Sequence, residues 1–179
     1  MNSPKLKMPA PNASAPTSPD TGTGARRSAR PAPDAIDHSA LGHLLGYAMA
    51  RADVHVRPAF QARIGEPLQL RPVEFSLLVL LLTNDDVTQT RLTQALAMSA
   101  PNLTTLVDRL VERGLVERVR SEQDRRAQLV CLTAAGRELA TRARELSLTM
   151  EDEALRELSA AERAILLELL HRVGRPRGR

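Results

Sequence analysis

The sequence has very few aromatic residues and only one cysteine. Tyr47, Phe60 and Phe75 are its only aromatic side chains, and tryptophan is absent. Leucine, alanine, glutamate and arginine dominate instead, a composition that favours an α-rich fold over a β-sandwich. Cys131 has no second cysteine with which to form an internal disulfide, so nothing calls for an oxidising compartment.

The chain also lacks an apolar run long enough to cross a membrane, and its proline-rich start has no apolar segment of the signal-peptide kind. We therefore expect a cytoplasmic protein without a membrane partner. Catalytic signatures are missing too: there is no Gly-x-Ser-x-Gly, no phosphate-cradling glycine loop, no His-Glu-x-x-His and no cysteine pair for zinc. The sequence predicts neither an enzyme nor a metal or cofactor site.

Basic residues are concentrated at the two ends of the chain. The formal charge is +4 and the pI is near 10.1, values that suggest a polyanionic partner. Residues 1–35 hold five basic and two acidic side chains, and the last eight residues hold four arginines. Residues 36–171 are left with more acidic than basic side chains. Any contact of this part with a polyanion must therefore come from a local patch.

The composition divides the chain into two tails and one domain. Residues 1–35 contain seven prolines and almost no large apolar side chain, so we expect a disordered, Pro/Ala/Ser-rich basic tail. Its arginines could reach phosphates as a flexible arm, but a solubilising tail is the preferred interpretation. Residues 36–173 have the length of one domain with one core, and residues 174–179 form a second basic tail.

Helical periodicity appears from Ile36 onward. Up to about residue 62, apolar residues recur at three- and four-residue steps and predict one amphipathic helix of about six turns. Its stripe comprises Leu41, Leu44, Leu45, Ala48, Ala52, Val56 and Phe60. Pro72 suits the first turn of a second helix, which the dense apolar run from Phe75 to Leu82 predicts to be buried on most sides. Turn residues end it at Asn84-Asp85-Asp86.

A helix-turn-helix pattern follows. Thr88 suits the N-cap of a short helix, and Ser99 suits that of a second helix. One face of the second helix is apolar and comprises Leu103, Leu106, Val107 and Leu110. The opposite face carries small polar groups and one arginine, suited to base edges and phosphates: Pro101, Asn102, Thr104, Thr105, Asp108 and Arg109. Gly114 stands where a left-handed residue would end this helix.

Two short strands are predicted next, at 115–120 and 127–132, separated by a polar tip that contains Asp124-Arg125-Arg126. Thr133 then caps a helix that begins at Ala134. A helix-turn-helix followed by such a hairpin is a winged helix, here residues 72–133. This arrangement presents one helix to the major groove of DNA and an arginine-bearing loop to the minor groove beside it.

Four stretches resemble the MarR family of bacterial transcriptional regulators: Leu92–Leu96, Leu103–Arg118, Asp124–Ala127 and Leu132–Gly136. The Asp-Arg-Arg wing followed by Leu-Thr-x-x-Gly is the most specific part of the resemblance, which extends from about residue 40 to 173. It implies a mainly α fold with a small β-hairpin wing. It also implies an obligate homodimer, with dimerisation helices in 36–62 and 134–173 and two winged helices on an inverted repeat of double-stranded DNA. Arg71 departs from the family, in which threonine commonly precedes the proline, and this weakens an N-cap.

The resemblance also implies roles for individual residues in DNA binding. Asn102, Thr104, Thr105 and Arg109 would lie in or beside the major groove. Arg125, with Arg126 beside it, would reach the minor groove, and Asp124 would orient the arginines by an ion pair. Thr88 and Ser99 would direct helix N-termini at phosphates. The alternative for Arg125 and Arg126 is a solvated turn.

The last predicted helix supports the homodimer. Ser159 and Glu162 form a capping box, and the helix after them carries a broad apolar stripe. The stripe comprises Ile165, Leu166, Leu169, Leu170 and Val173, before Gly174 and Pro176 end the helix. The first helix of the same chain could cover it, but the resemblance favours a second copy.

A ligand-binding strip is predicted on the first helix. His43, Tyr47, Arg51 and His55 repeat every four residues and would share one side of the helix. Because the resemblance implies effectors between the dimer helices and the winged helix, Arg51 could bind a carboxylate and Tyr47 an aromatic ring. The predicted small-molecule effector is a small aromatic acid or its thioester, whereas a solvated helix flank explains the same pattern. About 18 Å of helical rise separates the two histidines, too far for a shared metal.

Two other functions remain as alternatives. Cys131 could sense oxidants, but its place between Val130 and Leu132, without a basic neighbour in the strand, favours a small packed residue. A winged helix that binds proteins and not DNA is the second alternative. The preferred interpretation is a dimeric transcription factor, a repressor whose ligand favours a dimer with recognition helices mis-spaced for DNA.

Overall fold

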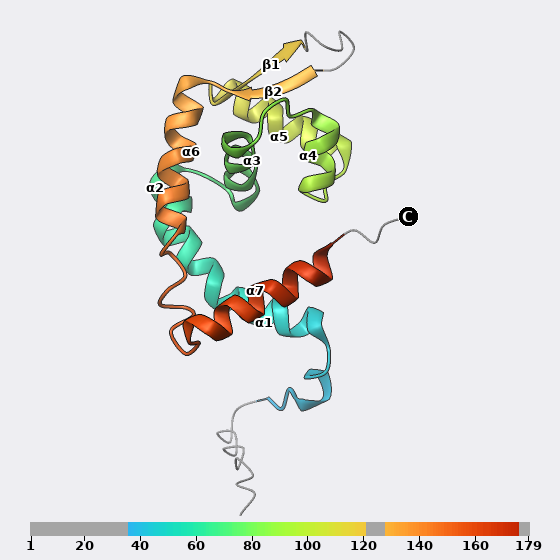
Figure 1. The fold of residues 1–179 in the computed structure, drawn as a ribbon, viewed down its shortest axis with the longest axis vertical. Helices are drawn as coiled ribbons and strands as arrows, with labels where there is room; N and C mark the ends of the chain where they lie inside the picture. Colours follow the sequence, from blue (N-terminus) through green and yellow to red (C-terminus); the bar gives the residue numbers. More distant parts are fainter. Residues whose placement is uncertain (1–35, 121–127, 176–179) are drawn as a thin grey trace, which may run out of the picture. The chain divides into compact units, whose positions relative to one another are not determined.

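The structure is a computed structural model that describes residues 36–120 and 128–175. Its helices are α1 (Leu45–Phe60), α2 (Glu66–Leu68), α3 (Pro72–Thr83), α4 (Gln89–Ala95), α5 (Ala100–Glu112), α6 (Ala134–Ser147) and α7 (Ala160–Gly174), with a 3-10 turn η1 (Ser39–Leu41) and a π-helical turn η2 (Gln61–Gly65) (Figure 1). Strands β1 (Val116–Arg120) and β2 (Gln128–Leu132) form one antiparallel hairpin. Among the described residues, no helix is both long and apolar enough to cross a membrane.

The chain divides into two units, Met1–Ala40 and Leu41–Arg179. In the described end of the first unit, Asp37 accepts hydrogen bonds from the backbone N–H and the hydroxyl of Ser39. Within the described ranges, all the α-helices and both strands belong to the second unit, and the fold of this unit places the candidate site.

The first helix is shorter than its periodicity predicted. The expected helix from Ile36 is wrong, because a 3-10 turn occupies Ser39–Leu41 and α1 begins only at Leu45. Leu44 precedes α1 in extended backbone and makes no side-chain cap hydrogen bond, so no capping residue marks this start. At the other end, the chain continues from α1 into the π-helical turn η2, which buries Ile64 and Gly65.

Helix α3 supplies the centre of the core, as its dense apolar sequence predicted. Leu77, Leu78 and Leu81 are buried, and α3 packs against α6 and β2. Pro72 occupies its first turn, where a missing N–H leaves no hydrogen bond unmade. Asp86, in the turn that follows α3, adopts a left-handed backbone with φ 52°.

The helix-turn-helix has its predicted buried face and the helix cap expected at Thr88. The Thr88 hydroxyl accepts a hydrogen bond from the Arg91 N–H at 3.3 Å, and the four predicted apolar residues of α5 are buried. Gly114 ends α5 with φ +68°. The Leu115 N–H donates to the Leu110 carbonyl and the Gly114 N–H to the Val111 carbonyl, which is the Schellman pattern.

The wing strands lie within one residue of their predicted bounds. They pair from Val116 opposite Leu132 to Arg120 opposite Gln128. β2 is also attached to the chain before α4, because the Val130 N–H donates to the Val87 carbonyl at 2.9 Å. The hairpin is therefore anchored to the helix-turn-helix on the side of α4 as well as through β1.

The start of α6 is fixed against the end of α5. The Thr133 hydroxyl caps α6 by accepting from the Gly136 N–H at 3.0 Å, and it donates to the Gly114 carbonyl at 2.7 Å. Gly136 lies so close to Leu115 that an added Cβ would be 1.8 Å from the Leu115 carbonyl oxygen. The glycine of Leu-Thr-x-x-Gly is thus required by a close backbone approach.

Two of the helices expected to dimerise, α1 and α7, expose large apolar residues. α6 ends at Ser147, turns follow, and α7 begins at the predicted capping box, in which Ser159 and Glu162 each bond the other's backbone N–H. α7 runs through Gly174, one residue beyond its expected end. Large apolar residues of α1 and α7 are between 42% and 67% exposed in this chain: Leu45, Met49, Val54, Ile165, Leu166, Leu167, Leu169 and Val173.

Candidate nucleic-acid interface

Helix α5 presents a small polar surface opposite its buried face. Asn102, Thr104 and Thr105 are exposed there. The hydroxyls of the two threonines donate to the carbonyls of Ala100 and Pro101, one turn earlier, at 3.0 and 3.1 Å. Each threonine therefore offers its methyl group and the lone pairs of its oxygen. Those groups match a thymine methyl and the amino groups of adenine or cytosine.

Ser99 stands at the N-cap of α5, but its hydroxyl does not cap the helix. Its backbone is extended, with φ −71° and ψ 150°, and no side-chain cap hydrogen bond is formed. The predicted position is confirmed and the predicted hydrogen bond is wrong. Because Pro101 in the first turn has no N–H, the backbone donors that this end of α5 can offer to an anion are those of Ala100 and Asn102.

Arg109 is directed at an acidic side chain of α3. Its Nη1 lies 3.7 Å from Glu74 Oε1, a pairing that was not predicted from the sequence. Arg113, one turn later, lies closer, with Nη1 3.3 Å from Glu74 Oε2. A contact of Arg109 with DNA stays a prediction, and any such contact competes with this carboxylate.

Glu74 is the buried acid in this cluster, and sequence reasoning missed it. Its side chain is 2% exposed and also accepts a hydrogen bond from the Arg71 N–H at 2.9 Å. Arg71 makes no side-chain cap hydrogen bond, but Glu74, three residues later, accepts the backbone N–H at this N-cap position. The sequence did contain a signal for this burial, because the helical spacing places Glu74 on the same face of α3 as Leu77, Leu78 and Leu81, the face that packs in the core.

A second missed ion pair connects α5 to the wing. Arg118 of β1 donates from Nη2 to Asp108 Oδ1 at 2.6 Å, and both side chains are partly exposed. Asp108 had been grouped with the outward polar face of α5. It faces the wing instead, and the pair fixes the orientation of the hairpin relative to the helix.

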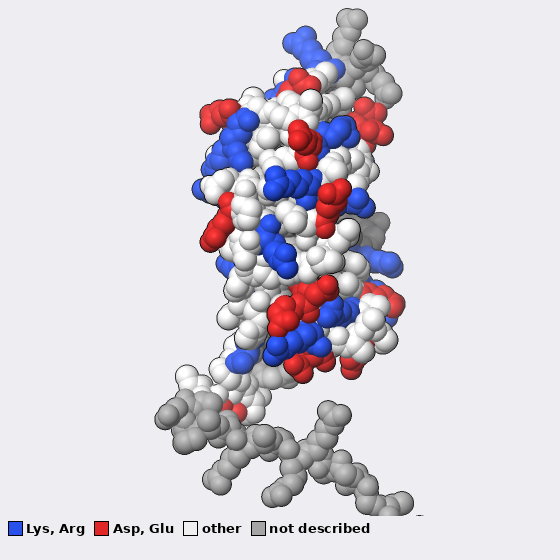
Figure 2. All heavy atoms as spheres, turned by 90° about the vertical axis from the view of Figure 1, so that its left-hand side faces the viewer, with Lys and Arg blue, Asp and Glu red and all other residues white. Residues whose placement is uncertain are grey.

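The wing tip lies outside the described residues. Asp124, Arg125 and Arg126 fall in the undescribed stretch between the two strands, so their predicted contacts with DNA stay predictions. The face of the second unit that carries α6 and α2 mixes both signs of charge, as Figure 2 shows. On α6, one hollow is lined by side chains of both signs: Arg137, Glu138, Arg142 and Glu145. That face offers no continuous basic surface.

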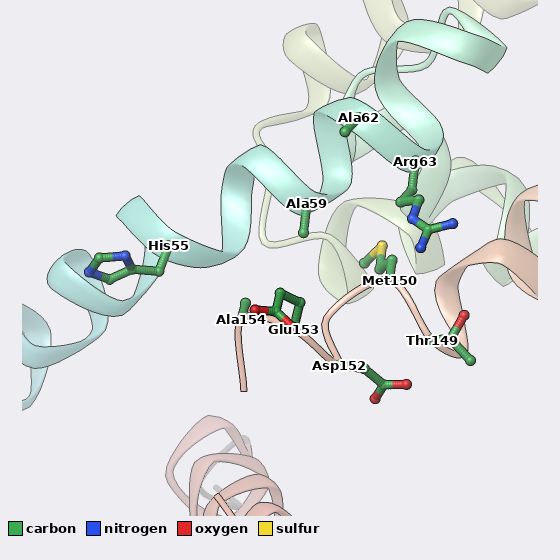
Figure 3. Close-up of a pocket in the computed structure, with 9 residues that line it drawn as sticks. All are labelled: His55, Ala59, Ala62, Arg63, Thr149, Met150, Asp152, Glu153 and Ala154. Atoms are coloured by element: carbon green, nitrogen blue, oxygen red, sulfur yellow. The ribbon is translucent and has the colours of Figure 1, made fainter. Parts of the chain in front are cut away.

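The predicted ligand strip is only partly helical. His43 precedes α1, so the expected four-residue repeat begins at Tyr47. Of the strip, His55 lines a pocket of about 610 Å³ between the α1–η2 segment and residues 149–154 (Figure 3). Figure 3 shows His55 at one end of the pocket and Arg63 extending toward the loop that carries Thr149 and Met150. Arg63 was not among the predicted residues.

The described residues give no support to metal binding or to a reactive thiol. Within 36–120 and 128–175, no three His, Cys, Asp or Glu side chains gather as a metal site would need. Burial raises the pKa of the Cys131 thiol, and the nearby carboxylates Glu117 and Asp86 raise it further. A raised pKa disfavours the thiolate that reacts with oxidants.

Comparison with known proteins agrees with this geometry. A sequence model of the MarR family matches residues 68–127. The multiple antibiotic resistance protein MarR of Escherichia coli K12 is 32% identical over 108 residues, which are 60% of this chain and 75% of that protein. The transcriptional repressor CouR bound to a 23-mer DNA duplex is 37% identical with a TM-score of 0.71, over 79% of this chain and 99% of that one. CouR bound to p-coumaroyl-CoA is 35% identical with a TM-score of 0.69, over 80% and 100%. The chain therefore belongs to the MarR family of transcriptional regulators, and its winged helix is that of the family.

Proposed function

We propose that this protein is a homodimeric repressor that binds an inverted repeat in double-stranded DNA and leaves it when a small molecule binds. The observation that carries the proposal is the exposed face of α5, where Asn102, Thr104 and Thr105 lie opposite four buried apolar residues. The similar protein CouR has been solved on a DNA duplex, which supports this use of the face.

A few positions would carry the DNA contacts, because the body of the chain is net acidic. Asn102 can pair with both polar atoms on the major-groove edge of adenine, and Thr104 and Thr105 can contact thymine methyls. The uncapped N-terminus of α5 at Ser99 can receive a phosphate. Arg125 would enter the minor groove, with Asp124 and Arg126 beside it.

Binding to duplexes selected from a random pool tests this function. We expect Asn102→Ala to weaken binding to the selected site by about 1–3 kcal/mol and to relax discrimination at one base pair. Arg125→Ala should reduce the salt dependence of binding, whereas Arg137→Ala, which removes the same charge from α6, should not. Unchanged affinity and salt dependence in both the Asn102 and Arg125 variants would instead indicate a winged helix that binds proteins.

The homodimer is supported by the exposed apolar residues of α1 and α7, which a second copy would cover. A two-fold dimer would place two α5 helices about one DNA turn apart, as an inverted repeat requires. Sedimentation at micromolar concentration should show a dimer that Leu169→Glu dissociates. Val119→Glu, which adds the same charge at a 41% exposed position of the wing, should leave the dimer intact. A wild-type protein that is monomeric at this concentration and keeps its fold would refute the proposal that a second copy covers α1 and α7.

The effector is proposed to be an aromatic acid or its thioester, because the similar protein CouR has been solved bound to p-coumaroyl-CoA. The pocket beside His55 has a suitable volume, and Arg63 on its wall can pair with a carboxylate. p-Coumaroyl-CoA, p-coumarate and benzoate should be titrated into the protein–DNA complex. We expect Arg63→Gln to lose the response and Arg51→Gln, outside this pocket, to keep it. If Arg51→Gln loses the response and Arg63→Gln keeps it, the ligand binds at the predicted strip on α1. If none of these compounds releases the DNA and peroxide does so through Cys131, the protein senses oxidants and not a ligand.

A further inference from the structure

Two arginines of α5 face a buried carboxylate. Arg109 and Arg113 lie about one helical turn apart, and their Nη1 atoms are 3.7 and 3.3 Å from the two oxygens of Glu74. The Glu74 side chain is 2% exposed, whereas those of the arginines are 39% and 31% exposed. The acid is therefore fixed inside the protein, and the cations lie at the boundary with solvent.

Glu74 cannot follow the arginines outward. Its carboxylate accepts the backbone N–H of Arg71 at 2.9 Å, and its helix face carries the buried Leu77 and Leu78. A buried carboxylate requires at least one cationic partner, and Arg113 is within hydrogen-bonding distance. Arg109, at 3.7 Å, is beyond that distance and is the looser of the two partners.

The Arg109 guanidinium has room for a second position. It borders an open pocket of about 490 Å³, whose lining also includes Arg71, Glu74 and Arg113. On α5, Arg109 follows Thr105 by four residues, so it lies one turn along from the face proposed to contact DNA. A guanidinium released from Glu74 would lie on the flank of that face, within reach of the phosphate backbone.

We propose that Glu74 substitutes for a DNA phosphate: it holds the Arg109 guanidinium against the protein surface, away from the DNA backbone, and so lowers affinity for DNA of any sequence. This role rests on the DNA binding proposed above. An arginine that contacts a phosphate raises affinity for every sequence by releasing a counterion, and it carries no sequence information directly. Pairing Arg109 with Glu74 in place of a phosphate therefore raises the ratio of specific to non-specific affinity. Glu74 is a positioning residue for specificity, although it touches no DNA.

The isosteric variant Glu74→Gln tests this role on a short duplex of scrambled sequence, by fluorescence anisotropy across about 50 to 200 mM salt. Freed of the carboxylate, Arg109 should gain one phosphate contact. The slope of log K against log salt should then steepen by about 0.9, and affinity near 0.1 M salt should rise about five- to tenfold. Glu112→Gln removes the same charge from an exposed position at the end of α5, the helix that carries Arg109, and should leave the slope unchanged.

Arg109→Gln gives the opposite test in a chain that keeps Glu74. In contrast to the DNA contact that the family resemblance implies for Arg109, we expect Arg109→Gln to leave the salt slope unchanged in the wild-type background. In the double variant, it should return Glu74→Gln to the wild-type slope. A slope reduced by about 0.9 in Arg109→Gln alone would show that Arg109 already contacts phosphate and would overturn the proposal. The proposal would also be overturned if Glu74→Gln had the same salt slope and the same affinity for the scrambled duplex as Glu112→Gln. If circular dichroism shows that Glu74→Gln does not fold, the salt slope of Arg109→Gln in the wild-type background decides whether Arg109 contacts phosphate. A wild-type protein without salt-dependent DNA binding would refute the proposed function itself.

Discussion

Replacing Gly136 by alanine should destabilise the protein, although helix propensity alone predicts the opposite. Gly136 lies in the first turn of α6, and an alanine Cβ there would be 1.8 Å from the carbonyl oxygen and 2.8 Å from the carbonyl carbon of Leu115. Both atoms belong to the backbone, which cannot turn aside as the end of a flexible side chain can. Either α6 or the start of the wing must therefore move.

The size of the effect follows from two opposing contributions. Forcing an extra carbon into a packed site costs about 1–3 kcal/mol, and a backbone contact this short belongs at the upper end. Alanine regains at most about 1 kcal/mol over glycine in a helix. We expect a net loss of about 2 kcal/mol in the free energy of unfolding, or a melting temperature lower by about 4–8 °C.

Urea unfolding at one fixed protein concentration measures this loss, since a dimer's apparent stability depends on concentration. Ala135→Gly, the reverse change at the exposed neighbouring position, is the control and should cost at most about 1 kcal/mol. If only propensity mattered, Gly136→Ala would stabilise the protein and Ala135→Gly would destabilise it. A Gly136→Ala midpoint at or above that of the wild type would refute the close-contact argument.

Three further predictions concern single groups. Thr133→Val removes the hydroxyl that accepts from Gly136 and donates to Gly114, so urea unfolding should show a loss of about 1–2 kcal/mol that Thr133→Ser largely avoids. Hydrogen bonds from the Ser159 side chain and backbone lower the pKa of Glu162 in the folded protein. The stability that these bonds add is therefore complete above the pKa that Glu162 has in the unfolded chain, and it is lost as the pH falls through the pKa of Glu162 in the folded protein. Helical circular dichroism in the acid range should therefore fall more for the wild type than for Glu162→Gln, and equal curves would contradict this. Because burial raises the pKa of Cys131, iodoacetamide should alkylate it more slowly in the folded protein than in urea, and Cys131→Ser should bind DNA like the wild type.

Local signals in the sequence predicted the parts of the fold that depend on neighbouring residues. Thr88, Thr133 and Ser159 cap helices as expected, and Gly114 takes the left-handed conformation that ends α5. Each of these features depends on the geometry of a few consecutive residues, which residue type largely determines. The wing strands were placed within one residue for the same reason.

The features that the sequence did not predict depend on distant parts of the chain. The pairing of Glu74 with Arg113 joins residues 39 positions apart, and that of Asp108 with Arg118 requires the wing to fold back on α5. Periodicity also could not place the start of α1, because the stripe of apolar residues continues through Leu41 and Leu44, where the backbone is not α-helical. The same pattern therefore placed His43 on a helix to which it does not belong.

The junction of Gly114, Leu115, Thr133 and Gly136 has a consequence for how this protein can diversify. The hairpin leaves the junction at Val116 and returns to it at Leu132, its closing residue pair. The hydrogen bonds that fix α5 against α6 all lie on the inner side of that pair. Residues inserted or exchanged between Arg120 and Gln128 would thus change the reach of the wing without rotating α5. Mutation can in this way adjust the sequence preference at the edges of an operator separately from the preference at its centre.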